Sequence, residues 1–188
     1  MQIKTPRLLL RPYTPEDFED YYAYIKDKEF QRLLGLEGME DRDCALVNFQ
    51  WLLERRVFLA LVDPAGGRAM GHICVHPPLE QVAEDPRFSE KAGASLSFAL
   101  DRRAWRQGLM TEALEAVIGW LFREGAVFLD CENEPANTAS AALQRKLGFR
   151  PWGTERIAGT ELTVNVLRRR EWRKGSRGTA CKQRRKVL

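Results

Sequence analysis

The segment 102–111 combines basic side chains, a glycine and an expected helix start, which together could bind phosphate. It reads Arg102-Arg103-Ala104-Trp105-Arg106-Gln107-Gly108-Leu109-Met110-Thr111 and follows an expected strand. The first turn of a helix leaves backbone N–H donors unpaired at the positive end of the helix dipole, and a glycine there lets a diphosphate approach the backbone. Arg102, Arg103 and Arg106 are expected to add positive charge. The segment therefore predicts an anion site, with an unliganded charged loop as the alternative.

Asn137 and Ser140 form a second polar pair, at the start of the next expected helix. Residues three apart share one helix face, and in a strand–helix–strand–helix unit both helices begin at the same edge of the sheet. We therefore expect this pair to lie near the 102–111 loop. The structural alternative is an N-cap role for Asn137 and a packing role for Ser140.

Hydrophobic periodicity predicts the elements that position these residues. Strands are expected at 7–11, 57–62, 69–76, 94–100, 126–131, 150–157 and 161–168, and helices at 14–25, 27–34, 41–55, 108–123 and 137–147. Cys44, Val47, Trp51 and Leu52 are expected on the apolar face of the 41–55 helix. Two strand–helix–strand steps among hairpins predict an α/β fold with a mixed sheet and helices on both faces, rather than a fully parallel sheet.

Motifs of several other enzyme classes are absent. The chain has no G-x-G-x-x-G, no complete P-loop or nucleophile elbow, and no H-E-x-x-H. Dinucleotide, nucleotide-triphosphate, serine-hydrolase and zinc-protease functions therefore lose their usual support. Cys44, Cys74, Cys131 and Cys181 form no C-x-x-C pair, so we expect reduced thiols and no metal site.

Composition predicts one globular domain with an uneven charge distribution. Of 188 residues, 44% are hydrophobic and 30% are charged, with 30 Lys or Arg and 26 Asp or Glu. Residues 168–188 hold ten of these bases and one acid, which leaves 20 bases and 25 acids elsewhere. No secretory leader or membrane-spanning run is visible, so a cytoplasmic protein is expected. The basic end is expected to be solvated, with salt-dependent nucleic-acid binding as the alternative.

Four segments in this order resemble the GNAT family of acetyl-CoA-dependent N-acetyltransferases. The likeness is closer to the branch of ribosomal-protein N-terminal acetyltransferases, RimJ and RimL. The segments are 5–12, 105–113, 137–149 and 171–172. The chain departs from the family pattern at Arg106, where a glycine is usual, and at Met110, where a small residue is usual.

The resemblance implies a mostly antiparallel, twisted sheet of about seven strands that splays between the fourth and fifth, 94–100 and 126–131. It implies a domain over 1–174 and a basic extension at 175–188. Acetyl-CoA, the acetyl donor, would lie in the gap between these two strands. No metal is implied. Its contacts would come from the backbone of Phe98, Ala99 and Leu100, from the loop residues Trp105, Arg106, Gln107, Gly108, Leu109, Met110 and Thr111, and from Asn137.

The implied reaction is direct attack of a primary amine on the thioester in a ternary complex. An alkylamine must first lose a proton at pH 7, and the developing oxyanion needs a donor such as a backbone N–H of 98–100. Ser140 is expected to assist departure of the thiolate, beside Asn137. Glu132, just beyond an expected strand end, is the favoured general base, and His76, Glu134 and ordered water are alternatives.

The branch resemblance indicates a peptide or protein N-terminus as the acceptor, with a ribosomal protein among the candidate partners. A small-molecule amine, such as a polyamine, an aminoglycoside or an amino acid, is the first alternative. A non-catalytic acyl-CoA-binding regulator and a ribosome- or RNA-associated protein are further alternatives. The sequence does not indicate which oligomeric state the protein adopts.

Overall fold

Eight strands form one twisted sheet within the residues that the computed structural model describes, which are 2–34, 36, 38–55, 57–157 and 159–172. The strand order is β1-β2-β3-β4-β5-β6-β8-β7. All neighbouring strands run antiparallel except β5 and β6, which are parallel. The strands are β1 (Ile3–Lys4), β2 (Leu9–Pro12), β3 (Phe58–Val62), β4 (Ala69–His76), β5 (Gly93–Leu100), β6 (Phe128–Asn133), β7 (Arg150–Ile157) and β8 (Thr160–Arg168).

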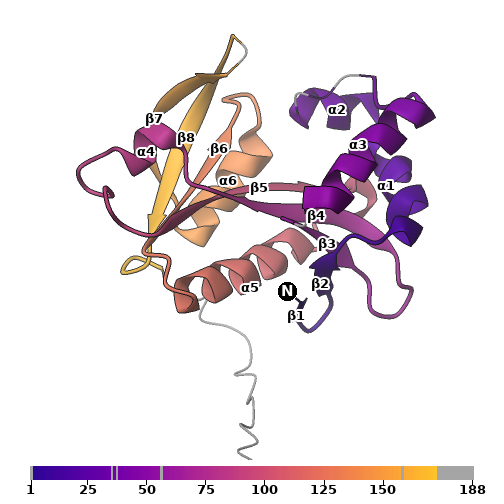
Figure 1. Ribbon diagram of the computed structural model, residues 1–188, viewed down its shortest axis with the longest axis horizontal. Helices are drawn as coiled ribbons and strands as arrows, with labels where there is room; N and C mark the ends of the chain where they lie inside the picture. The colour runs from indigo at the N-terminus through magenta and orange to yellow at the C-terminus, as the bar shows by residue number, and fades with distance from the viewer. Residues whose placement is uncertain (1, 35, 37, 56, 158, 173–188) are drawn as a thin grey trace, which may run out of the picture.

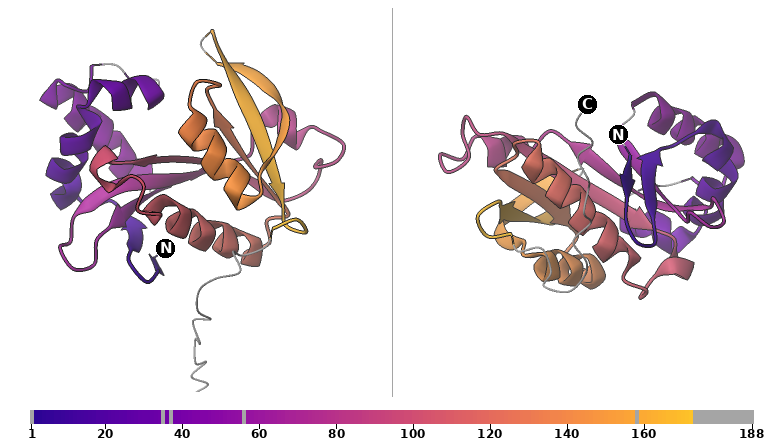
Figure 2. Two further views of the ribbon diagram at one scale, coloured as in Figure 1. Left: turned by 180° about the vertical axis from the view of Figure 1, so that it is seen from behind. Right: turned by 90° about the horizontal axis from the view of Figure 1, so that it is seen from below.

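Helices cover both faces of this sheet (Figures 1 and 2). The predicted mixed α/β fold is therefore confirmed, and the two-residue β1 is added to the seven expected strands. The helical elements are η1 (Pro15–Asp17), α1 (Phe18–Ile25), α2 (Lys28–Leu34), α3 (Arg42–Arg55), α4 (Glu80–Ala83), η2 (Arg102–Ala104), α5 (Leu109–Arg123) and α6 (Thr138–Leu147).

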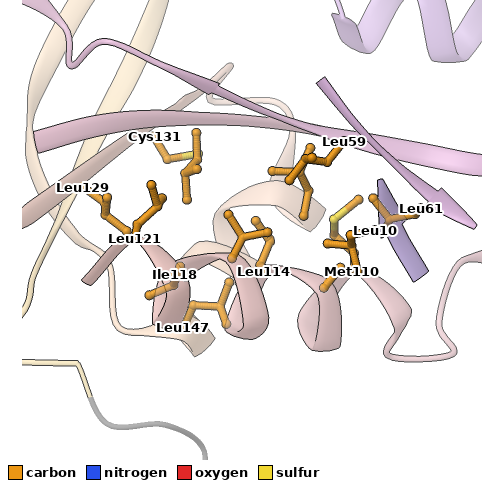
Figure 3. Packing of buried hydrophobic residues seen from close by; sticks show 14 of the residues in the cluster. Leu10, Leu59, Leu61, Met110, Leu114, Ile118, Leu121, Leu129, Cys131 and Leu147 are labelled. Atoms are coloured by element: carbon orange, nitrogen blue, oxygen red, sulfur yellow. The ribbon is translucent and has the colours of Figure 1, made fainter. Parts of the chain in front are cut away.

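The apolar stripe of α5 packs against one face of the sheet (Figure 3). Met110 lies beside Leu10 and Leu61 at one end of the helix, and Leu121 lies near Leu129 and Cys131 at the other. Burying a Leu or Met side chain contributes roughly 1.5–3 kcal/mol. This packing therefore holds the start of α5, and the loop before it, in a fixed place against the sheet.

The opposite face is covered by α1 and α3 over β3 and β4, where Phe49 and Ile25 pack with Ala60 and Cys74. Leu52 is buried there as expected, together with Ala45 and Phe49. The prediction for the rest of this apolar face is wrong, because Cys44, Val47 and Trp51 are exposed. Two adjacent stripes of this helix both have helical spacing, and only the contact with α1 and the sheet selects the one that is buried.

The parallel pair β5 and β6 separates along its length, which confirms the predicted splay. Paired residues run only from Gly93 with Phe128 to Ser95 with Asp130, although β5 continues to Leu100 and β6 to Asn133. Strand β6 starts and ends two residues later than expected. Glu132 therefore lies inside β6, beyond the last residue that pairs with β5 but still paired with β8, and not in the following loop.

The predicted boundary at residue 174 and the extension 175–188 lie outside the described residues. Within the described ranges, no helix combines the length and the apolar character needed to cross a membrane.

Candidate active site

A cleft of about 540 Å³ opens where β5 ends and where α5 and α6 begin. The structure brings most of the predicted cofactor-binding residues together there. Gln107 and Glu132 are not among the residues that line it. The predicted residues that do are Phe98, Ala99, Leu100, Trp105, Arg106, Gly108, Leu109, Met110, Thr111, Asn137 and Ser140.

The loop before α5 turns through two left-handed residues. Gly108 has φ +75° and caps the helix, and Arg106 has φ +61°. A residue with a side chain pays on the order of 1–2 kcal/mol for this conformation. The geometry thus explains why glycine is usual at the position of Arg106 in the family that the chain resembles.

The first turn of α5 supplies hydrogen-bond donors to the cleft. The N–H of Glu112 donates to the carbonyl of Gly108 at 3.0 Å, which is the first bond of the helix. The N–H groups of Leu109, Met110 and Thr111 precede that bond and find no acceptor within the described residues. Three such donors at a helix start suit a diphosphate.

The cationic side chains at the cleft are only part of the expected set. Arg103 makes hydrogen bonds of 2.7–3.1 Å to the carboxylate of Asp101, and Arg102 lies 3.6 Å from Asp27. Neither Arg102 nor Arg103 lines the cleft, and each instead pairs with one of these carboxylates. Among the described bases, Arg106 and Lys146 line the cleft.

One edge of β5 is free for a ligand beyond the splay. The Asp101 N–H donates to the carbonyl of Met70 on β4. The carbonyl of Ala99 also faces β4, because a Cβ added at Gly71 would lie 2.3 Å from its oxygen. Polar backbone groups alternate in direction along a strand, so those of Phe98 and Leu100 face the cleft. Trp105 Nε1 donates to the Leu100 carbonyl at 2.7 Å. The backbone N–H and carbonyl of Phe98 can therefore pair with an amide-containing chain.

The start of α6 places Asn137 and Ser140 at the same cleft. The Oδ1 of Asn137 accepts the backbone N–H of Ser140 at 3.0 Å, so Asn137 is an N-cap, as the structural alternative held. Gln144 Nε2 donates to Ser140 Oγ at 3.1 Å and to the carbonyl of Glu132 at 3.3 Å. Asn165 in turn donates to Gln144 Oε1 at 2.9 Å. Sequence reasoning missed Gln144, whose only signal is its position four residues after Ser140.

Glu132 lies among carboxylates on the sheet face opposite α5. Burial and the nearby Glu155 raise its pKa, and its Oε2 is buried without a partner in the described structure. Burial also raises the pKa of Asp130 to about 6, with further contributions from Glu132 and Glu155. The Oδ1 of Asp130 is likewise buried and unpartnered among described residues. This face therefore suits a cationic group.

The other candidate bases differ in their surroundings. His76 Nε2 lies 2.9 Å from Ser97 Oγ on the neighbouring strand, and burial lowers the pKa of His76. The backbone carbonyl of Glu134 accepts from the Asn137 N–H at 2.9 Å and so shapes the turn into α6. In the described part of the chain, no group of three or more His, Cys, Asp or Glu side chains is arranged to hold a metal.

Comparisons with known proteins agree with this geometry. Residues 7–150 match the acetyltransferase (GNAT) domain family. The curated relatives include the uncharacterized N-acetyltransferase YoaA of Bacillus subtilis, 28% identical with 87% of this chain and 93% of the relative covered. An N-acetyltransferase 9-like protein of Caenorhabditis briggsae is 22% identical, with 80% and 78% covered.

Solved structures share the fold. A GNAT-family acetyltransferase from Bacillus anthracis has a TM-score of 0.71 at 19% identity, covering 89% of this chain and 98% of its own. A ribosomal-protein-S5-alanine acetyltransferase from Vibrio fischeri has a TM-score of 0.64 at 14% identity, covering 92% and 99%. A GCN5-related N-acetyltransferase from Brucella melitensis has a TM-score of 0.72 at 17% identity, covering 92% and 80%.

Proposed function

Because the chain belongs to the GNAT acetyltransferase family and is an acetyl-CoA-dependent N-acetyltransferase, we propose that it moves the acetyl group directly to a primary amine in a ternary complex. The observation that carries this proposal is the single cleft that joins the free edge of β5, the unpaired N–H groups of α5 and the hydroxyl of Ser140. Acetyl-CoA supplies an acyl thioester, whose carbonyl carbon the amine attacks and whose thiolate departs.

Each part of the cleft has a role in the proposal. The N–H groups of Leu109, Met110 and Thr111 hold the diphosphate, with Arg106 and Lys146 nearby. The backbone of Phe98 pairs with the amide arm, and a backbone N–H of this strand stabilises negative charge at the reacting oxygen. Ser140 Oγ accepts from Gln144, so its own hydrogen remains available to the sulfur.

Glu132 is the general base in this proposal. It lies two residues beyond Asp130, where β6 has separated from β5. Its raised pKa makes it a stronger proton acceptor than an ordinary glutamate. His76 is the alternative base, and burial lowers its pKa, which favours its neutral form.

The proposed acceptor is a peptide or protein N-terminus, as in the RimJ and RimL branch. Support comes from the resemblance of the four sequence segments and from a structural neighbour described as a ribosomal-protein-S5-alanine acetyltransferase. A cationic small-molecule amine is the second candidate. The carboxylates of Asp130, Glu132 and Glu155, each with one buried and unpartnered oxygen in the described structure, favour it.

A panel assay tests the proposal. Release of CoA from acetyl-CoA is measured with peptide N-termini, ribosomal-protein N-terminal peptides, polyamines, aminoglycosides and amino acids. Turnover highest with peptides supports the proposed acceptor, and turnover highest with a polyamine or aminoglycoside supports the second candidate. CoA binding without turnover on any amine would instead support a non-catalytic regulator. RNA binding at two salt concentrations, with and without residues 175–188, tests the remaining alternative.

A further inference from the structure

The segment before β2 is tied to the first turn of α5. Thr5 Oγ1 donates to Glu112 Oε1 at 2.6 Å, and the backbone N–H of Arg7 donates to the same oxygen at 2.9 Å. Arg7 Nε donates to Glu112 Oε2 at 2.7 Å. Both oxygens of Glu112 are thus used to hold a segment more than a hundred positions earlier in the sequence.

The same guanidinium also reaches the loop that precedes α5. Arg7 Nη1 donates to the carbonyl of Gln107 at 2.8 Å. In a trans peptide the carbonyl of one residue and the N–H of the next point in opposite directions. Fixing the Gln107 carbonyl toward Arg7 therefore directs the N–H of Gly108 away from Arg7.

The two sides of this peptide face different spaces. Arg7 and Gln107 line a second cavity of about 310 Å³, whereas Gly108 and Arg106 line the 540 Å³ cleft. Arg7 is not among the residues of the cleft, so it reaches a ligand there only through the loop. Its charge is also matched by the ion pair with Glu112, which makes orientation its main contribution.

We propose that Arg7 is a positioning residue that orients the Gln107–Gly108 peptide toward the diphosphate of CoA. This inference rests on the proposed function. Arg106 before Gln107 holds a left-handed φ that local preference disfavours, and Gly108 after it can adopt φ of either sign, so local preference does not fix this peptide. A fork that binds Glu112 with one nitrogen and Gln107 with another determines it instead. Lysine has a single nitrogen and cannot hold both positions in this way.

The test compares donors with and without a diphosphate. CoA affinity is measured by calorimetry for the wild type, Arg7→Ala and Arg7→Lys. Steady-state kinetics are measured with acetyl-CoA and with S-acetyl-pantetheine, which lacks the diphosphate. The control is Arg42→Ala, which removes an arginine of similar exposure that pairs with Glu19 on the surface.

Both Arg7 variants should weaken CoA binding about tenfold, the factor expected for one charge-assisted hydrogen bond. KM for acetyl-CoA should rise by the same factor, with kcat within about twofold. Kinetics with S-acetyl-pantetheine, and all values for Arg42→Ala, should match the wild type.

Three results with the Arg7 variants would overturn the inference. Unchanged CoA affinity in both variants would exclude the role, and an equal loss with both donors would indicate general damage to the fold. Full rescue by Arg7→Lys would show that charge alone matters. If Arg7→Ala does not fold, Arg7→Lys decides between these outcomes. Failure of the wild type to bind CoA would overturn the proposed function, and the inference with it, and is recognised before any variant is compared.

Discussion

Ser140 Oγ accepts a hydrogen bond of 3.1 Å from Gln144 Nε2, and Gln144 is almost completely buried. The same amide group reaches the carbonyl of Glu132 on β6 and is itself held by Asn165 on β8. The direction of the Ser140 hydroxyl is therefore set by the sheet and not by α6 alone. Its hydrogen is left to donate toward the cleft.

Replacing Ser140 with alanine should lower kcat at least about tenfold and leave the Kd for CoA within twofold. The reason is that the hydroxyl assists the departing thiolate, whereas binding depends on the loop and on β5. Rapid-mixing or steady-state assays with acetyl-CoA and calorimetry with CoA measure the two quantities. Thr138→Ala, an exposed change two residues earlier in α6, is the control. Unchanged turnover in Ser140→Ala would contradict the assignment.

Replacing Glu132 with glutamine should lower kcat/KM about 100-fold and remove the acid limb of its pH profile. A base acts only when deprotonated, so wild-type activity should fall as the pH drops through the raised pKa of Glu132. Glu161→Gln, an exposed change on β8, should leave the profile as it is. If Glu132→Gln keeps the acid limb, another group is responsible for that limb. Loss of the acid limb in His76→Gln would then identify His76 as that group.

Asp130→Asn should raise the free energy of unfolding at pH 7 by about 2 kcal/mol. The folded-state pKa of Asp130 is about 6, above its ordinary value of 3.8. The folded protein therefore binds this proton more tightly than the unfolded chain, and wild-type stability should fall as the pH rises from about 4 to about 6. Urea unfolding at pH 4 and pH 7 measures the change, with exposed Asp43→Asn as the control. Equal destabilisation of Asp130→Asn at both pH values would count against this explanation.

Gly108→Ala should lower the free energy of unfolding by about 1 kcal/mol and weaken CoA binding. The nearest atom to an added carbon is Arg7 Nη2 at 3.6 Å, so there is room for it, and the cost comes from the left-handed φ of +75°. Gly153→Ala is the matched control, since no described atom lies within 4 Å and its φ is not in the left-handed region. Thermal unfolding and calorimetry measure both effects. Equal stability of the two variants would show that the loop can change its conformation at no cost.

Local signals in the sequence were sufficient for most elements and for the principal polar residues. The order of strands and helices, the helix starts at Gly108 and Asn137 and the ending of α6 at Gly148 depend on residues within about four positions. So does the shared helix face of Asn137 and Ser140. These features follow from backbone preference and hydrophobic period, which a single sequence contains.

Tertiary structure alone decided the remaining features. It selected Phe49 over Val47 as the buried side of α3, and it paired Arg102 with Asp27, Gln144 with Asn165 and Arg7 with Glu112. It also placed Asp130, Glu132 and Glu155 on one face, which follows from the β6-β8-β7 strand order. Such contacts link positions tens of residues apart. Their energies depend on which segments the sheet brings together, and no local preference in the chain determines that.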